Sequence, residues 1–214
     1  MRAQADPSSA VARASALARD FWPPGDIAGL AAVEPDSVPE PARGLLDHQS
    51  HMTVAMERFH GTEVRLRVAA VVDRPDVPGA WYAREILLEK PDGVVVQYGI
   101  VRIDLGAVDA ETARTIRAGR RPLGRVLIDA GVLRDVHRVA LVAIRPGPHL
   151  AGLMRLPTGG SHGNGPRATP SSAPVPPPGP GEGGCVYGRV AEILLNGRPA
   201  VQLLEIVAPV AIVP

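Results

Sequence analysis

Apolar and polar residues alternate with a period of two along much of the chain, which is typical of half-buried β-strands. In EVRLRVAAVVD, Val64, Leu66 and Val68 share one face, while Arg65 and Arg67 share the other. We expect this strand region to begin near Met52. Similar runs bounded by turn residues follow in WYAREILLEK, GVVVQYGIVRIDL, VLRDVHRVALVAI, VYGRVAEILLN and PAVQLLEIVAP.

A few segments show helical spacing instead. The Ala-rich stretch from about 8 to 20 predicts one helix, and 41–46 a second short one. DAETARTIRAG and RPLGRVLIDAG predict two more, which end at Gly119 and Gly131. Runs of strands with a few helices between them indicate an α+β fold: a single antiparallel β-sheet with the helices packed on one face.

The composition along the chain predicts one domain. We expect residues 1–40 to be a helical, Pro-rich N-terminal extension, 41–209 to form the domain, and 210–214 to form a tail. Between Pro157 and Gly184, 16 of 28 residues are Gly or Pro, and such a segment cannot bury enough surface to offset its ordering entropy. We therefore expect 157–184 to be a disordered loop that interrupts the domain, with the final hairpin completing the sheet.

The charge balance excludes some classes of partner. The chain has 23 basic and 22 acidic residues, with no basic block of the kind that nucleic-acid binding requires. Cys185 is the only cysteine, which excludes an internal disulfide and a thiolate zinc cluster. No apolar run has the length of a signal peptide or a membrane span, so we expect a cytoplasmic protein that binds neither nucleic acid nor membrane.

Two charged residues depart from the strand pattern. Arg84 shares the face of its strand with Ile86 and Leu88, and Glu205 is the sole charge between Ala200 and Val213. Two interpretations are open: the two residues pair with each other or lie at a strand edge, or they line a cavity in which Arg84 holds an anion and Glu205 donates a proton. The pattern alone does not decide between them.

Two further stretches contain candidate ligand-binding groups. Leu123 and Gly124 begin a predicted helix, where free backbone N–H groups attract anions. Asp47, His48 and His51 have the chemistry of metal ligands, but the two histidines would face opposite ways in a strand, and no third strong ligand stands out elsewhere. We predict no metal site, and interpret the remaining histidines as surface or loop residues: His60, His137, His149 and His162.

Taken together, five motifs resemble those of the chorismate pyruvate-lyase family in order and spacing. They are HMT at 51–53, YAREILL at 82–88, RPLGRVLI at 121–128, YGR at 187–189 and GRPAVQLLEIVAP at 197–209. The resemblance covers roughly 44–156 and 185–209. It implies conversion of chorismate to 4-hydroxybenzoate and pyruvate in an internal site, without metal or organic cofactor, by a monomer or small homo-oligomer. It does not decide whether the product enters ubiquinone biosynthesis.

The resemblance also assigns roles to particular residues. Met52, Arg84, Leu123 and Glu205 would bind the substrate, with Arg84 on the ring carboxylate and Glu205 as the acid that protonates the leaving enolpyruvyl oxygen. Met52 and Leu123 would be apolar walls, with the backbone N–H groups near Leu123 or Glu85 available to polar groups. Arg125, in the same predicted helix as Leu123, is a candidate for the second carboxylate by proximity alone.

A second class of function fits the same resemblance. The fold also resembles the effector-binding domains of some bacterial transcription regulators, which bind small molecules without turnover. Such regulators carry a basic DNA-reading domain, and residues 1–40 are too short, too Pro-rich and too weakly basic for one. The alternative is therefore a non-catalytic domain that binds an aromatic carboxylate.

Overall fold

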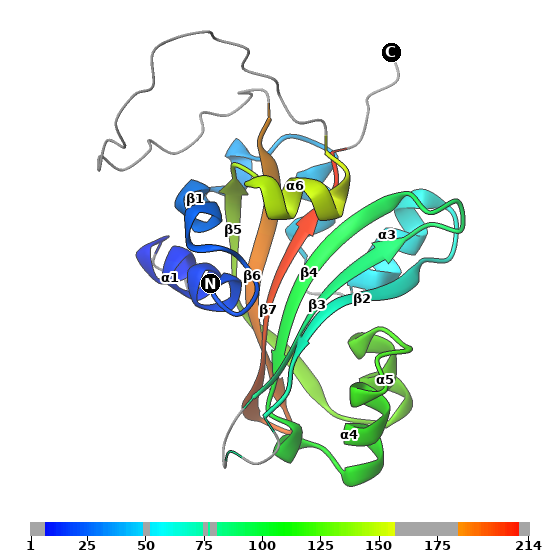
Figure 1. Cartoon of the computed structure of the whole chain (residues 1–214). Coiled ribbons are helices and arrows are strands. Elements are labelled where there is room, and N and C mark those ends of the chain that lie inside the picture. The colour runs from blue at the N-terminus through cyan, green and yellow to red at the C-terminus, as the bar shows by residue number, and fades with distance from the viewer. Residues whose placement is uncertain (1–6, 49–51, 75–76, 78–80, 157–183, 210–214) are drawn as a thin grey trace, which may run out of the picture.

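A single antiparallel sheet of seven strands, in the order β1-β5-β6-β7-β4-β3-β2, forms the centre of the protein (Figure 1). The computed structural model describes residues 7–48, 52–74, 77, 81–156 and 184–209. Its strands confirm the predicted runs and add a short edge strand. They are β1 (Leu30–Val33), β2 (Arg65–Val72), β3 (Tyr82–Glu89), β4 (Val95–Ile103), β5 (Arg134–Ile144), β6 (Val186–Leu195) and β7 (Arg198–Val207).

The central strands come from distant parts of the chain. β3 and β4 form one hairpin and β6 and β7 another, and the sheet is continuous because β4 pairs with β7. Positive φ angles at Gly93, Asn196 and Gly197 turn the chain at these hairpins. These residues lie in the sequences PDG (91–93) and NGRP (196–199), which are typical of hairpin turns. The final hairpin thus completes the sheet, as the sequence predicts.

Helices cover both faces of this sheet, which corrects the prediction that they pack on one face. The helices α1 (Pro7–Ala18) and α6 (Pro148–Met154) cover one face. Two pairs cover the other, α2 (Ala42–Leu46) with α3 (Met52–His60), and α4 (Ala110–Arg117) with α5 (Leu123–Asp129) (Figure 1). Both faces are buried because β3 and β4 carry apolar side chains on both sides, so these strands lack the strict alternation of a half-exposed strand.

The N-terminal residues belong to the core of the domain. Ala10, Ala14 and Leu17 of α1 are buried against the sheet, and β1 pairs with β5. The segment that begins at Met52 is helix α3, not the start of a strand; its buried Met52 and Met56 lie four residues apart, on one helical face. Short 3-10 helices fill three connections: Pro24–Gly29, Pro35–Ser37 and Leu105–Ala107.

Local sequence accounts for the two helices that follow β4. The Asp109 carboxylate accepts hydrogen bonds from the backbone N–H groups of Glu111 and Thr112 and so caps α4. Gly119 and Gly131, with φ angles of 66° and 63°, follow α4 and α5 in the left-handed conformation. The predicted ends of both helices are thereby confirmed.

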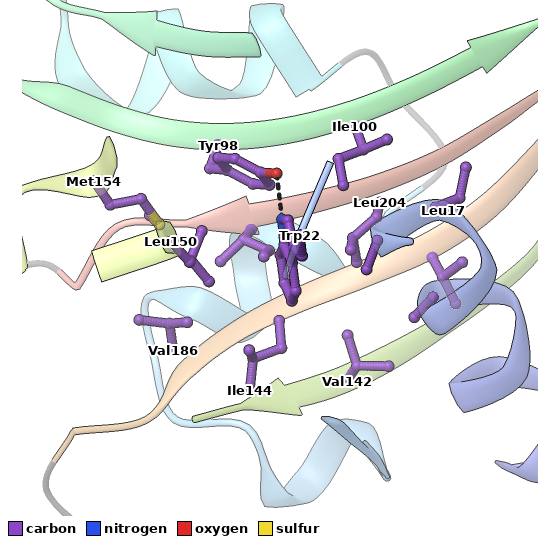
Figure 2. Close-up of a cluster of buried hydrophobic side chains, with 14 of the residues drawn as sticks. Leu17, Trp22, Tyr98, Ile100, Val142, Ile144, Leu150, Met154, Val186 and Leu204 are labelled. Carbon is purple, nitrogen blue, oxygen red and sulfur yellow. Dashed lines mark hydrogen bonds between the residues drawn. The ribbon is translucent and has the colours of Figure 1, made fainter. Parts of the chain in front are cut away.

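A buried polar network lies on the face covered by α1 and α6. The Glu85 side chain, 2% exposed, accepts a hydrogen bond from the Tyr98 hydroxyl at 2.5 Å and contacts Nε2 of His149 at 2.7 Å. Trp22 donates to the Tyr98 oxygen at 2.6 Å (Figure 2). Burial and the adjacent Glu85 raise the pKa of Tyr98, so this hydroxyl stays protonated and donates. His149, predicted to be a surface or loop residue, instead contacts this buried carboxylate from α6.

We expect Tyr98→Phe to lower the free energy of unfolding by about 2–3 kcal/mol, because it removes a donor from a buried carboxylate and an acceptor from the Trp22 indole. Urea denaturation measures the change. Tyr187→Phe is the matched control, since Tyr187 is only partly buried and we expect a loss of at most about 0.5 kcal/mol there. Equal losses in the two variants would show that the network adds no stability.

Several predictions fall on segments outside the described residues. These include the disorder expected of 157–184, of which only Gly184 is described, the tail 210–214, and the positions of His51 and His162. Within the described part of the chain, no helix combines the length and the apolar character needed to span a membrane.

Candidate functional site

A cavity of about 320 Å³ lies between the sheet and the helices α3 and α5. Its apolar walls come from two hydrophobic clusters, one with Met52, Ile86 and Leu88 and the other with Leu123 and Leu127. The cavity therefore occupies the junction between the α2–α3 pair and the α4–α5 pair. A volume of this size is typical of small-molecule sites, and the walls combine apolar side chains with several polar and charged ones.

Strand register fixes the polar groups on the floor of the cavity. Arg84 on β3 pairs with Val101 on β4, while the next row along the sheet contains Ile86, Gly99, Glu205 and Arg189. Gly99 contributes no side chain to this row, and a Cβ atom there would lie 3.3 Å from the side chain of Ile86. The glycine thus gives Ile86 room to lie close to the sheet between the charged positions.

Arg84 is a buried cation with no acidic partner among the described residues. The residue is 2% exposed, and its guanidinium donates to the backbone oxygens of Ile116 at 3.3 Å and Arg121 at 3.5 Å. Burial lowers the pKa of Arg84, and the neighbouring Tyr82 opposes that shift. A buried guanidinium with a neighbouring tyrosine and two long contacts to carbonyls, but no carboxylate, is poorly compensated, and a ligand carboxylate would compensate it through bidentate hydrogen bonds.

Glu205 pairs with a different arginine. Its Oε2 atom accepts a hydrogen bond from Nε of Arg189 at 2.7 Å, and these residues are cross-strand partners in the register of β6 and β7. The Nη1 atom of Arg189 also donates to the backbone oxygen of His48 at 2.7 Å. The pairing of Arg84 with Glu205, one of the two interpretations of the sequence, is therefore wrong.

All four residues predicted to bind substrate line this one cavity: Met52, Arg84, Leu123 and Glu205. They come from α3, β3, α5 and β7, which the sheet and its helices bring together. Arg125 does not line the cavity; its guanidinium instead pairs with Glu57 on α3 at 3.4 Å. Arg134 and Arg189 line the cavity in addition to Arg84.

The candidate metal ligands are only partly described. Asp47 follows α2, and the backbone oxygen of His48 binds Arg189, while His51 lies outside the described residues. Among the residues that the structure describes, no group of three or more His, Cys, Asp or Glu side chains could hold a metal ion.

Sequence reasoning missed five polar residues that line the cavity, namely Thr53, Gln97, Arg134, Asp135 and Arg189. Arg189 lies in the YGR motif, and its position opposite Glu205 follows only from the register of the hairpin. Gln97 interrupts the apolar run VVVQYGIV, a signal of the same kind as Arg84 in its strand. Burial lowers the pKa of Arg134, which donates to the backbone oxygen of Gly124 at 3.4 Å.

In comparisons with known proteins, the chain is similar to solved structures in its fold and not in its sequence. Neither a family model nor a curated protein matches the chain. The crystal structure of the PhnF C-terminal domain is 9% identical with a TM-score of 0.41, covering 69% of this chain and 84% of that one. PhnF from Mycobacterium smegmatis is 13% identical with a TM-score of 0.45, and the match covers 75% of this chain and 64% of PhnF. We take no function from these likenesses, and the chorismate pyruvate-lyase family stays a resemblance.

Proposed function

We propose that the cavity binds a small cyclic carboxylate, with Arg84 as the anchor of its negative charge. The observation that carries this proposal is the buried Arg84 guanidinium without an acidic partner in the described chain. A ligand carboxylate would supply the missing counter-charge, and charge-assisted hydrogen bonds of this kind contribute about 1.5–3 kcal/mol.

The lining of the cavity supports a ring as the rest of the ligand. Met52 and Leu123 provide apolar surface from two different helices, and Ile86 provides it from the sheet. The apolar walls favour the carbon skeleton, while the polar and charged groups between them fix its orientation. An aromatic or cyclohexadiene carboxylate has this combination of an apolar ring and one or two charged groups.

Isothermal titration of the purified protein with 4-hydroxybenzoate and 4-hydroxybenzamide tests the proposal. The two ligands have the same ring and hydroxyl, but only the first carries a carboxylate. We expect the acid to bind at least about tenfold more tightly than the amide, because only the acid neutralises Arg84. Equal affinities, or no binding of either ligand, would contradict the proposal.

A second candidate function is the chorismate pyruvate-lyase reaction itself. The observation that favours it is the presence of Met52, Arg84, Leu123 and Glu205 on the walls of one cavity. In that reaction the ether bond between the ring and the enolpyruvyl group breaks, the leaving oxygen takes up a proton, and the ring loses its C4 proton to become aromatic. Glu205 would be the proton donor.

Because of the contact between Glu205 and Arg189, we favour ligand binding without turnover over the lyase reaction. In this arrangement the Oε2 atom of Glu205 accepts a hydrogen bond, whereas the reaction requires the carboxyl group to donate one. A non-catalytic domain needs no such change, because an ion-paired Glu205 is simply a polar wall of the cavity.

Incubation with chorismate distinguishes the two functions. If the protein is a lyase, 4-hydroxybenzoate and pyruvate form in equal amounts, and Glu205→Gln lowers the rate by at least about a hundredfold, the lower range for loss of a general acid. If the protein only binds, chorismate is recovered unchanged from a complex that titration detects. Product formation at an unchanged rate in Glu205→Gln would exclude the assigned role of Glu205.

A further inference from the structure

Gln97 is a buried polar residue in an apolar row of the cavity floor. The residue is 1% exposed, and its side-chain Oε1 atom has no hydrogen-bond partner. Its cross-strand partners are Leu88 on β3 and Val207 on β7, both buried and apolar. A buried amide oxygen without a partner is rare in native proteins, and such exceptions concentrate at functional sites.

The position of Gln97 relative to Arg84 is set by the sheet. Arg84 pairs with Val101, and Gln97 lies four residues from Val101 along β4 on the same face. The Cα atoms of Arg84 and Gln97 are thus roughly 14 Å apart, from the rise per residue and the spacing of antiparallel strands. The Arg84 and Gln97 side chains extend into the cavity and take up part of this separation. The space that remains between their polar ends suits a single six-membered ring with polar groups at opposite ends.

The amide of Gln97 matches one chemical group in particular. Its terminal side-chain bond rotates easily, so either the oxygen or the NH₂ group can turn toward the cavity. A hydroxyl group both donates and accepts, and it therefore satisfies either orientation. A second carboxylate would suit only the NH₂ group, and it would leave the oxygen without a donor.

We infer that Gln97 is a specificity-determining residue that binds a hydroxyl group of the ligand, at the end of the ring away from Arg84. The inference rests on the proposed binding of a carboxylate, and it narrows the ligand class to hydroxylated ring carboxylates. Arg84 supplies affinity for the charge, while Gln97 discriminates against ligands that lack the hydroxyl. A site with a buried amide rejects such analogues because the amide then stays unpaired.

The test compares the affinities of benzoate, 3-hydroxybenzoate and 4-hydroxybenzoate for the full chain and for Gln97→Met. We expect the native protein to prefer at least one hydroxybenzoate over benzoate by about tenfold, and the variant to bind the hydroxybenzoates and benzoate with similar affinities. Gln202→Met is the matched control: Gln202 lies on β7 with its side chain on the opposite face, where Arg102 donates to it. This control should keep the preference.

A ligand-free measurement gives an independent readout. Because Gln97→Met removes an unpartnered buried polar group, we expect the melting temperature of the ligand-free protein to rise by about 2–4 °C. A lower melting temperature, or a hydroxyl preference that survives in Gln97→Met or is absent from the native protein, would overturn the role of Gln97. If the native protein binds all three acids equally and Arg84→Met binds none, carboxylate binding stands without Gln97; if the native protein binds none, both proposals fail.

Discussion

Replacing Arg84 by methionine is expected to reduce the affinity for 4-hydroxybenzoate by at least about ten- to a hundredfold, which corresponds to the loss of one charge-assisted hydrogen-bonding group. Methionine retains the length and apolar surface of the side chain but removes the charge. Because Arg84 is a buried cation without an acidic partner in the described chain, its removal should leave the ligand-free protein at least as stable. Titration calorimetry and thermal unfolding measure the two effects.

Arg125→Met is the control for this variant. Arg125 belongs to α5 but does not line the cavity, and its side chain is 45% exposed in its contact with Glu57. We expect its removal to change the affinity by less than about twofold. An Arg84→Met variant that binds as tightly as the native protein would remove Arg84 as the anchor, and a large loss in Arg125→Met would restore the role that the sequence suggested for Arg125.

The second large effect concerns the buried ion pair between Arg189 and Glu205. Their side chains are 3% and 13% exposed, and the distance between Nε and Oε2 is 2.7 Å. Arg189→Met leaves a carboxylate without its partner in an apolar site, and breaking such pairs costs about 3–5 kcal/mol. We expect a loss of this size in urea denaturation.

A double variant separates the cost of an unpaired charge from the value of the pair. The double variant combines Arg189→Met with Glu205→Met, so it removes both charges of the pair and leaves neither of them unpaired. We expect it to recover most of the stability that Arg189→Met loses, because apolar replacements of buried ion pairs are often neutral. Arg121→Met is the surface control; Arg121 pairs with Asp129, the side chains are about half exposed, and we expect at most about 1 kcal/mol there. If the double variant is as unstable as Arg189→Met, loss of packing explains the effect and not the unpaired charge.

Much of the fold could be predicted from local patterns. The strands from β2 to β7 follow from β-rich runs bounded by turn residues, and the ends of α4 and α5 follow from Gly119 and Gly131. Helix α3 was missed because its buried Met52 and Met56 stand in a short segment of mixed apolar and polar residues, shortly before β2. β1 is four residues long, too short for periodicity to show.

The coverage of both faces by helices was not predictable from the same signals. Alternation in EVRLRVAAVVD describes an edge strand with one exposed face, whereas the inner strands β3 and β4 are buried on both. The contact of His149 with the buried Glu85 was missed for the same reason, because Glu85 lies on the face of the sheet that α6 covers. Contacts between elements far apart in sequence depend on which helix packs against which face.

Only part of the candidate site could be predicted from the sequence, because its contacts also depend on how distant elements pair. A charge in an apolar strand is visible in the sequence, and Arg84 and Glu205 were found in this way. Their partners were not, because the pairing of Glu205 with Arg189 depends on the register of β6 against β7. Gln97 carried a weaker signal, since a single neutral polar residue in a strand is common at surfaces.

The most direct test of a carboxylate anchored by Arg84 is a crystal structure of the protein with 4-hydroxybenzoate. We predict that the ligand occupies the cavity between α3 and α5, with both carboxylate oxygens within hydrogen-bond distance of the Arg84 guanidinium and the ring against Met52 and Leu123. A ligand whose carboxylate binds Arg134 or Arg189 instead, or a cavity that stays empty at saturating ligand, would contradict the account.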